Sequence, residues 1–419
     1  MKQPVTSAPA ETLAPGPQPS APAIEGPVAV IFNRFGPYHL ARLRAAGRRV
    51  RLIGIEAFGK DKVRDWEVVR GADGFRRVTL FETEEDDTGP SRVARATRRA
   101  LERERPRVVV LAGWSSPEAL SGLAWALRNS VPAILMADST WQDWRRTRLR
   151  EGVKRRVVSL YSTALVAGSK HLDYTAELGL PRDRIFLGYD VVDNEHFRSG
   201  AERARADAGL RARLGLPGRF FLACCRFIDV KNLPRLLEAY RRYHSLARDP
   251  WSLVLVGDGP LRAEVESTIR QLGLQTSVAT PGFAQYDALP AYYGLAGAAV
   301  LASVSETWGL TVNEAMAAGL PVLVSRHCGC ARDLVEEGRN GFTFDPCNVE
   351  QLSQSMLRLS SMSAAEREAM GRASQEIVNR WTPELFAENL EKAARAALAA
   401  PQRTASVLDR TLLWLLIHR

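Results

Sequence analysis

Two glutamates with seven residues between them offer hydroxyl-binding chemistry at the start of a predicted helix. Glu306 follows the apolar run 298–302, whose pattern is typical of a buried parallel strand. Glu314 lies in a small-residue helix that Gly319 and Pro321 are expected to end. Carboxylates in this arrangement could bind the hydroxyls of a sugar or a ribose. An ordinary strand-turn-helix connection with solvated acids would have the same spacing, so both interpretations stay open.

The turn between the two glutamates could bind an anion. Trp308, Gly309 and Leu310 are expected to turn the chain and to point a helix N-terminus outward. Free amide groups and the positive end of the helix dipole attract negative charge there. The turn and the glutamates together offer phosphate and polyol recognition, which is what a sugar nucleotide requires.

Two cations follow a predicted strand in the second half of the chain. Arg226 ends that strand and Lys231 opens the next helix, a placement that suits a diphosphate. A solvated arginine and a helix-start lysine would fit the same pattern. Farther on, Gly257-Asp258-Gly259 forms a second strand-to-helix turn, where glycines would let a ligand approach the backbone. Such a sequence is also common turn chemistry.

Two series of alternating strands and helices would position these residues. Strands that alternate with helices indicate βαβ units, so we predict an α/β protein with two Rossmann-like, doubly wound parallel sheets. Ligands of such sheets bind beyond the carboxyl ends of the strands, which draws attention to loops 33–39, 113–117 and 138–143. The predicted strands are 28–32, 50–55, 77–81, 108–112, 133–137 and 163–167, then 220–225, 252–257, 277–281, 298–302 and 321–325. Helices are expected between them, among others at 91–104, 117–129, 142–160, 232–247, 261–272 and 287–295.

The length of 419 residues is too great for one core and predicts several domains. The boundaries that we expect are a disordered Pro/Ala-rich lead at 1–26, a first Rossmann-like domain on the acceptor side at 27–197, a linker at 198–218, a second domain for the donor at 219–382, and C-terminal helices at 383–419, for which a return to the first domain is one path.

The composition is that of an ordinary globular protein, with 46% hydrophobic and 25% charged residues. No apolar run reaches the roughly 20 residues of a membrane span, and the lead lacks the apolar core of a secretory signal. We therefore expect a cytoplasmic protein whose five cysteines are free thiols.

The net charge of +10 is concentrated in the first half, where residues 27–200 hold 31 Lys and Arg against 22 Asp and Glu. An acidic partner, such as a membrane surface or a phosphorylated acceptor, would explain this imbalance. A general preference for arginine in the genome would explain it equally. The charge is accompanied by no nucleic-acid-binding motif, so we expect no nucleic-acid partner.

Four motifs occur in one order: Arg226 with Lys231-Asn232, then 256–260, then 305–315, and then 338–342. This order resembles the donor domain of the group 1 (family 4) retaining glycosyltransferases with the GT-B fold, and the resemblance extends from residue 28 to about residue 400. It implies two domains facing a cleft, in which a hexose moves from a nucleotide sugar to the hydroxyl of a glycan or lipid-linked acceptor.

The resemblance also implies roles for single residues. Arg226 and Lys231 would hold the diphosphate and stabilise the leaving group, Glu306 would contact hydroxyls of the transferred sugar, and Glu314 would bind the ribose. The other donor-binding positions would be Gly257, Asp258, Thr307, Trp308, Gly309 and Leu310, the last two through their amide groups. No Asp-x-Asp motif stands at a strand end, so we expect transfer without a metal or another cofactor.

The sequence departs from the family on the acceptor side. Asp138 stands where many relatives have a histidine; it could orient the acceptor hydroxyl and support positive charge on the sugar, or cap a helix. Gly36 precedes Pro37 where relatives often have paired glycines. His39, two residues later, could contact the acceptor or simply begin a helix.

Segment 141–156 mixes two tryptophans with seven cations. A basic helix of this kind can lie on an anionic membrane, which would suit a lipid-linked acceptor; a solvated helix with a few inward side chains is the alternative. Two other functions remain open: a sugar-nucleotide epimerase on the same fold, and a non-catalytic sugar-nucleotide-binding subunit.

Overall fold

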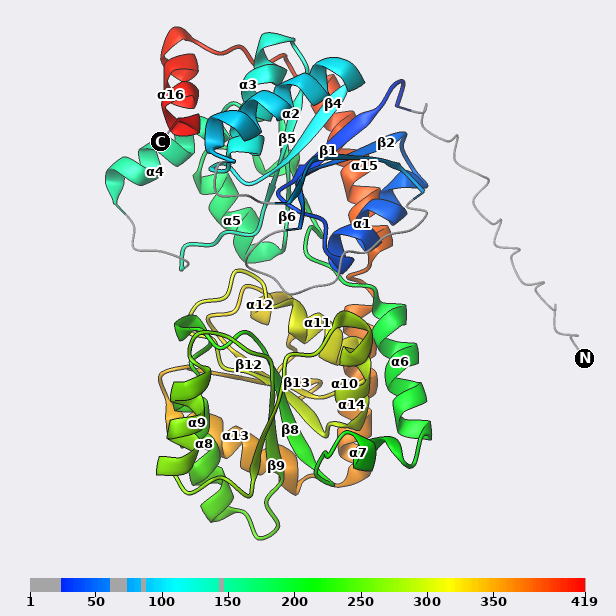
Figure 1. The fold of residues 1–419 in the computed structure, drawn as a ribbon, viewed down its shortest axis with the longest axis vertical. Coiled ribbons are helices and arrows are strands. Elements are labelled where there is room, and N and C mark those ends of the chain that lie inside the picture. The colour runs from blue at the N-terminus through cyan, green and yellow to red at the C-terminus, as the bar shows by residue number, and fades with distance from the viewer. Residues whose placement is uncertain (1–23, 61–73, 84–87, 143–146, 419) are drawn as a thin grey trace, which may run out of the picture.

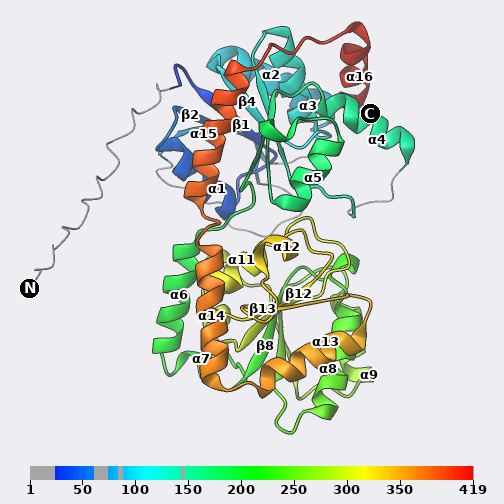
Figure 2. The same cartoon turned by 180° about the vertical axis from the view of Figure 1, so that it is seen from behind.

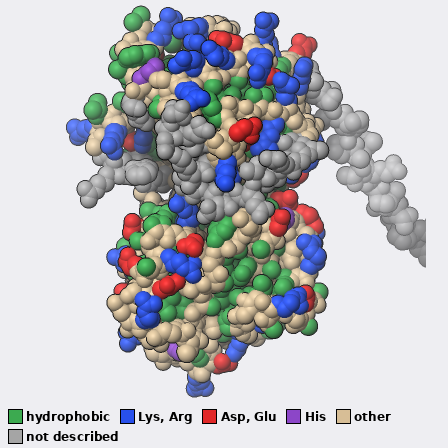
Figure 3. Space-filling view, in the orientation of Figure 1, with side chains coloured by type: hydrophobic (Ala, Val, Ile, Leu, Met, Phe, Trp, Pro, Cys, Tyr) green, Lys and Arg blue, Asp and Glu red, His purple; other side chains and the backbone are tan. Residues whose placement is uncertain are grey.

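Two parallel sheets, one in each half of the chain, organise the computed structural model, which describes residues 24–60, 74–83, 88–142 and 147–418. The two α/β domains lie one above the other in Figure 1, and the predicted fold class is confirmed. Figure 3 shows Lys and Arg side chains gathered over the outer end of the first domain.

The first sheet has seven parallel strands, among them β1, β4 and β5, which are covered by helices on both faces. Strands buried in this way need apolar side chains on both faces, and all five residues of β1 are indeed buried. Val30 of β1 pairs with Gly54 on one side and with Val110 on the other. The strands, in sheet order, are β3 (Arg76–Thr83), β2 (Leu52–Lys60), β1 (Val28–Phe32), β4 (Val108–Ala112), β5 (Ala133–Ala137), β6 (Thr163–Val166) and β7 (Ile185–Leu187).

The second sheet has six parallel strands and the same doubly wound arrangement. The order reverses between two neighbouring strands, β8 and β11, so their carboxyl ends flank the crevice in which such sheets bind ligands. The strands, in sheet order, are β10 (Val278–Gly282), β9 (Ser252–Val256), β8 (Phe220–Cys224), β11 (Ala298–Leu301), β12 (Val322–Ser325) and β13 (Gly341–Phe344).

In the described part of the first half, five helices cover the first sheet, and three of them begin with a proline, whose missing N–H costs nothing at that position. They are α1 (Pro37–Gly47), α2 (Pro90–Glu104), α3 (Pro117–Arg128), α4 (Arg148–Val158) and α5 (Ser169–Glu177). A short 3-10 helix, η1 (Arg182–Arg184), precedes β7.

The helices of the second domain begin before its first strand. They are α6 (Asn194–Ala206), α7 (Leu210–Arg213), α8 (Leu233–Leu246), α9 (Arg262–Gln271), α10 (Leu289–Leu295), α11 (Leu310–Ala317), α12 (Ala331–Leu334), α13 (Val349–Ser361) and α14 (Ala364–Val378), with 3-10 turns η2 (Asp229–Lys231) and η3 (Tyr286–Ala288).

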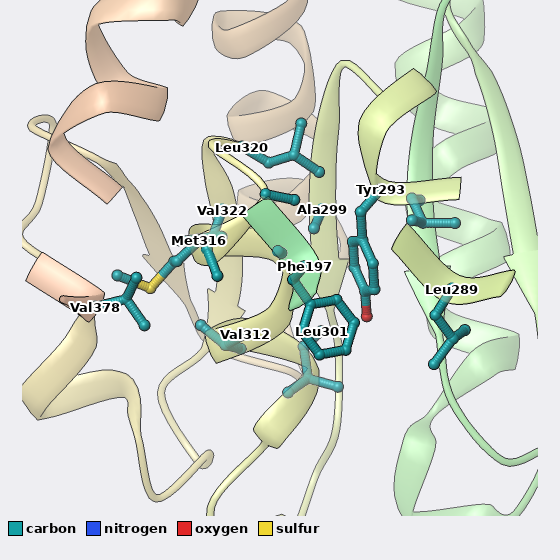
Figure 4. Packing of buried hydrophobic residues seen from close by; sticks show 14 of the residues in the cluster. Phe197, Leu289, Tyr293, Ala299, Leu301, Val312, Met316, Leu320, Val322 and Val378 are labelled. Atoms are coloured by element: carbon teal, nitrogen blue, oxygen red, sulfur yellow. The ribbon is translucent and has the colours of Figure 1, made fainter. Parts of the chain in front are cut away.

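Residues 198–218, which we expected to be a linker, fall largely in α6 and α7. Helix α6 packs tightly on α10 at Gly294, which has no side chain. An added Cβ there would lie 2.6 Å from the carbonyl oxygen of Ala201. Figure 4 shows Phe197 of α6 beside Tyr293 of α10, in the core that also contains Met316 of α11. This segment is therefore an integral layer of the second domain.

The chain returns to the first domain after α14, as Figure 2 shows from behind. Helix α15 (Pro383–Ala399) packs against α1 and β6, and Phe386, Leu390 and Ala394 are buried in the first-domain core. The last helix, α16 (Val407–Ile417), lies against α3. Two segments far apart in the sequence thus complete one domain.

Several element boundaries differ from those that we predicted. The helix expected at 142–160 begins at Arg148, because the Thr147 side chain accepts a hydrogen bond from the Arg150 amide and caps it there. Residues 143–146 of that segment and residues 1–23 of the expected lead lie outside the described residues. Strand β2 continues to Lys60, beyond the predicted end at 55. The short strands β7 and β13 were missed.

All five cysteines carry free thiols. Within the described residues, no helix is both long enough and apolar enough to cross a bilayer.

Candidate functional site

A cavity of about 580 Å³ lies between the carboxyl edges of the two sheets. The first domain contributes Tyr38, Asp138 and Asp190 to its lining. The second domain contributes the turns that follow β8, β9 and β11, and the first turn of α11. The fold therefore brings the ligand-binding ends of both sheets onto one cavity.

Most of the predicted site residues share this cavity. It is lined by Asp138, Arg226, Lys231, Gly257, Asp258, Glu306, Thr307, Trp308, Gly309, Leu310 and Glu314.

Gly36 and His39 are not among the lining residues, and both serve the start of α1 instead. The Gly36 amide donates a hydrogen bond to Nδ1 of His39 over 3.1 Å. The imidazole packs edge-on against Phe32, with 4.4 Å between the ring centroids. The structure thus places His39 at a helix start, the alternative that the sequence left open, and does not bring it to the cavity.

Lys231 and Glu306 form an ion pair, since β8 and β11 are neighbours and their following turns meet. The Lys231 ammonium donates to Oε2 of Glu306, which also accepts a hydrogen bond from the Ser303 hydroxyl over 3.1 Å. Burial lowers the pKa of Lys231, but the Glu306 carboxylate outweighs it, so the pKa is raised overall. Lys231 therefore stays a cation at this mostly buried position.

The turn that carries Lys231 is fixed by Asn232, whose φ of 59° is left-handed. The buried Asn232 amide donates to the carbonyl oxygens of Ala302 and Pro346 over 3.1 and 2.8 Å. Asparagine is one of the few residues that tolerate this conformation. Arg226, five residues earlier, has an exposed side chain at the cavity.

The turn after β9 requires a glycine. Gly257 has a φ of 140°, and an added Cβ would lie 1.8 Å from the carbonyl oxygen of Cys225. Asp258 accepts hydrogen bonds from the Gly259 amide at 2.7 Å and from Arg262 at 3.1 Å. Asp258 thus stabilises its own turn, and Gly257 lets two strand-end loops touch beside the cavity.

Glu314 is fully buried and bonded to two tyrosines. Its Oε1 accepts from Tyr38 of the first domain, and its Oε2 accepts from Tyr293 of the second, each over 2.6 Å. Burial raises the pKa of Glu314 to about 7, although both tyrosine hydrogen bonds favour the ionised form. The carboxyl group therefore links the two domains next to the cavity.

The turn before α11 is held from both domains. Gly309 caps the helix with a φ of 108°, which only glycine adopts readily. The buried Trp308 indole donates to Oδ1 of Asn313 over 2.9 Å. His171 of α5 contacts the carbonyl oxygen of Thr307 through Nε2 at 2.9 Å. The Gly168 amide bonds Nδ1, so Nε2 is the nitrogen that donates.

The first-domain wall of the cavity is acidic. Asp138 follows β5, and Asp190 follows β7. Asp190 accepts from Nη1 of Arg42 at 3.3 Å, and the same nitrogen donates to the Tyr189 carbonyl oxygen at 2.6 Å. Burial, and then the nearby Asp138 carboxylate, raise the pKa of Asp190 to about 7.

Sequence reasoning missed Tyr38 and Asp190. Tyr38 stands in loop 33–39, which was singled out, but a phenol there carries no signal for a partner 276 positions away. Asp190 follows a strand of only three residues, too short to be recognised by its pattern. Among the described residues, no group of three or more His, Cys, Asp or Glu side chains is arranged to hold a metal ion.

A family model matches much of the second domain. Residues 211–377 match the family described as glycosyl transferases group 1. Mannosylfructose-phosphate synthase of Agrobacterium fabrum is 33% identical over 195 residues, which are 43% of this chain and 41% of that protein. Alpha-monoglucosyldiacylglycerol synthase of Acholeplasma laidlawii is 24% identical over 240 residues, 54% of this chain and 60% of that protein. The chain thus spans about half the length of these relatives.

Solved structures match over most of the chain. Sucrose-phosphate synthase from Thermosynechococcus elongatus has a TM-score of 0.71 at 19% identity, with 90% of this chain and 100% of that chain covered. Anabaena HepE in complex with UDP has a TM-score of 0.68 at 16% identity, with coverages of 88% and 100%. These likenesses confirm the GT-B fold that the sequence predicted.

Proposed function

We propose that this protein, whose residues 211–377 match the family described as glycosyl transferases group 1, moves a hexose from a nucleoside-diphosphate sugar to an acceptor hydroxyl with retention at the anomeric carbon. One observation carries the proposal: Arg226, Lys231 and the start of α11 converge at the switch point of the second sheet, beside two carboxylates. Few ligands other than a sugar nucleotide would use both kinds of group.

The diphosphate would lie against the cations. Arg226 projects from an exposed position, and Lys231 has donors left beyond the one bound to Glu306. When the bond to the sugar breaks, negative charge grows on the diphosphate, and these fixed positive groups stabilise it. The amides of Gly309 and Leu310 would add donors at the helix N-terminus. This arrangement would serve the leaving group without a metal ion.

The carboxylates would bind hydroxyls. Glu306 keeps one oxygen beyond the Lys231 and Ser303 contacts, and that oxygen can accept from the transferred sugar. Glu314 has no exposed surface while Tyr38 covers it. Ribose hydroxyls would therefore reach Glu314 only when Tyr38 moves away. Because Tyr38 belongs to the other domain, donor binding and domain position would be coupled.

The acceptor would enter from the first domain. Asp138 lies on the opposite wall of the cavity, where its carboxylate could orient the acceptor hydroxyl and stabilise positive charge on the sugar. We propose a glycan or a lipid-linked saccharide as the acceptor, used in the cytoplasm at the inner face of a membrane. The relative named alpha-monoglucosyldiacylglycerol synthase supports a lipid, and the one named mannosylfructose-phosphate synthase supports a sugar.

A panel of nucleotide sugars would test the proposal. Calorimetry should show binding of one donor by the wild type and at least tenfold weaker binding by Glu314→Ala, as expected for loss of a charged hydrogen-bond acceptor. NMR of the product should show the anomeric configuration of the donor. Failure of every nucleotide sugar to bind would overturn the proposal. Conversion of the donor into its epimer without any acceptor would favour an epimerase instead.

A further inference from the structure

The last helix, α16, is apolar on the side that faces away from the protein as well as on the side that faces it. Leu413 and Ile417 are buried in the first-domain core. On the other side, Leu408 is 68%, Trp414 58% and Leu415 54% exposed. A surface helix normally has a polar outer face, so an outer stripe of large apolar side chains marks a surface that binds something.

The exposed stripe is regular and firmly held. Val407 and Leu408 are followed seven residues later by Trp414 and Leu415, which is two turns of one helix face. Ser406 and Asp409 form a capping box at the start of the helix, and Asp409 pairs with Arg156 of α4 at 2.5 Å. The helix is therefore anchored to the domain, and its outer face is displayed in a fixed orientation.

Basic helices surround the stripe. Helix α4, which contacts α16, has four Arg and one Lys against one Glu, and its Leu149 is 80% exposed. Helix α2, on another side, has five Arg against two Glu. Figures 1 and 3 show α16 and α4 at one outer corner of the first domain, with apolar and basic side chains next to one another.

From this combination we propose that α16, flanked by the basic faces of α4 and α2, is a docking surface for an anionic lipid bilayer. Tryptophan and leucine insert at the boundary between headgroups and acyl chains, while arginines bind the negative surface. A second copy of the chain is disfavoured as the occupant. A symmetric contact would bring the same positive helices against each other, and such like charges repel.

This surface differs from segment 141–156, for which the sequence left membrane contact and a solvated helix as alternatives. The segment at 141–156 supplies charge, but Val157 and Val158 at the end of α4 are buried, and α16 supplies the larger apolar area. A bilayer docked on this face would lie against the domain that carries Asp138, the domain on which the proposed function places the acceptor. Only this last step rests on the proposed function.

Flotation with vesicles tests the proposal directly. The wild type should float with vesicles of equal parts phosphatidylglycerol and phosphatidylcholine, and not with phosphatidylcholine alone. Trp414→Ala combined with Leu415→Ser should weaken binding about tenfold or more, because the inserted apolar area is lost. Neutralising Arg148, Arg150 and Arg155 to Gln should weaken it about fivefold per residue. The control is Leu246→Ser, a half-exposed leucine of the second domain.

Other outcomes would overturn the proposal. The first is a wild type that does not float with the anionic vesicles. The second is a Trp414/Leu415 variant that floats as well as the wild type. The third is a dimer that sedimentation detects without lipid and that is dissociated by the same two substitutions. Nucleotide-sugar binding by calorimetry separates the two proposals, since it should be unchanged in the α16 variants. If the wild type binds no nucleotide sugar, the proposed function is rejected, whereas the result on membrane docking still stands.

Discussion

The two walls of the cavity differ in the charged groups that they present. The second-domain wall presents Arg226, Lys231 and the N-terminus of α11, whereas the first-domain wall presents Asp138 and Asp190. A substrate with an anionic end and a hydroxyl-bearing end would be oriented by this difference before any specific contact forms. In the proposed function, this difference would distinguish the donor from the acceptor.

The second wall also holds three carboxylates, and the structure compensates each of them differently. Glu306 is paired with Lys231, Asp258 is paired with Arg262, and Glu314 is buried between two tyrosines. The positive character of this wall therefore comes mainly from Arg226 and the N-terminus of α11.

Loss of a cation on the positive wall should have the largest effect. Arg226→Ala should lower kcat about 10²- to 10³-fold, as for removal of one fixed donor to a developing anion. Its exposed position makes a folding defect small. Arg241→Ala, an exposed arginine of α8, is the matched control. Transfer at a near-normal rate by Arg226→Ala would contradict the role of the second-domain wall in binding the anionic part of the donor.

The raised pKa of the buried Glu314 carboxyl group predicts that the stability of the protein depends on pH. Its pKa in the folded protein is about 7, above the ordinary 4.5, so the folded state holds this proton to higher pH than the unfolded chain does. The free energy of unfolding should therefore fall by about 3 kcal/mol as pH rises from about 4.5 to about 7, and stay level above. Glu314→Gln should remove this share of the slope in urea titrations. Glu238→Gln, at an exposed site on α8, should leave the slope unchanged.

On the acidic wall, Asp138→Asn should lower kcat about 10- to 100-fold and leave the donor KM unchanged, since a charged hydrogen bond to the acceptor is lost. Initial rates at saturating donor measure this. Asp183→Asn removes an exposed carboxylate of the same domain and should have no effect. An equal loss in donor affinity would place Asp138 on the donor instead.

The smallest expected effect concerns the hydroxyl that joins the two walls. Tyr38→Phe removes the cross-domain bond to Glu314, so the ribose no longer competes with it, and donor binding should tighten several-fold. Tyr293→Phe removes the equivalent bond from within the second domain and should lower stability by about 1–2 kcal/mol without tightening the donor. Weaker donor binding by Tyr38→Phe would show that Tyr38 and the ribose do not compete.

The second wall could be placed from the sequence because its residues follow strand ends directly. Arg226 lies two residues after β8, and the Gly257 turn begins one residue after β9, so an approximate strand boundary was enough. Their roles in donor binding stay predictions. The family match over residues 211–377 covers the same domain.

The first wall was harder, because tertiary contacts assemble it. Asp190 reaches the cavity from a three-residue edge strand, and Tyr38 finds its partner in the other domain. The start of α4 was misplaced because the basic sequence of 141–156 has no clear break at Thr147, whose side chain caps the helix there. His39 has a side chain that could serve a site, but its Nδ1 accepts a hydrogen bond from the Gly36 amide at the start of α1.

The path of α15 has a consequence for how the protein is made. The side chains of Phe386, Leu390 and Ala394 fill the core beneath β1, β4 and β5, so the first domain cannot close until this distant helix has left the ribosome. Residues 194–378 form the other domain without it and can fold earlier during synthesis. The half of the protein that is translated first would therefore be the last to fold completely. Until then, one apolar face of its sheet would stay exposed. Chaperone dependence should accordingly be concentrated in the nascent first domain.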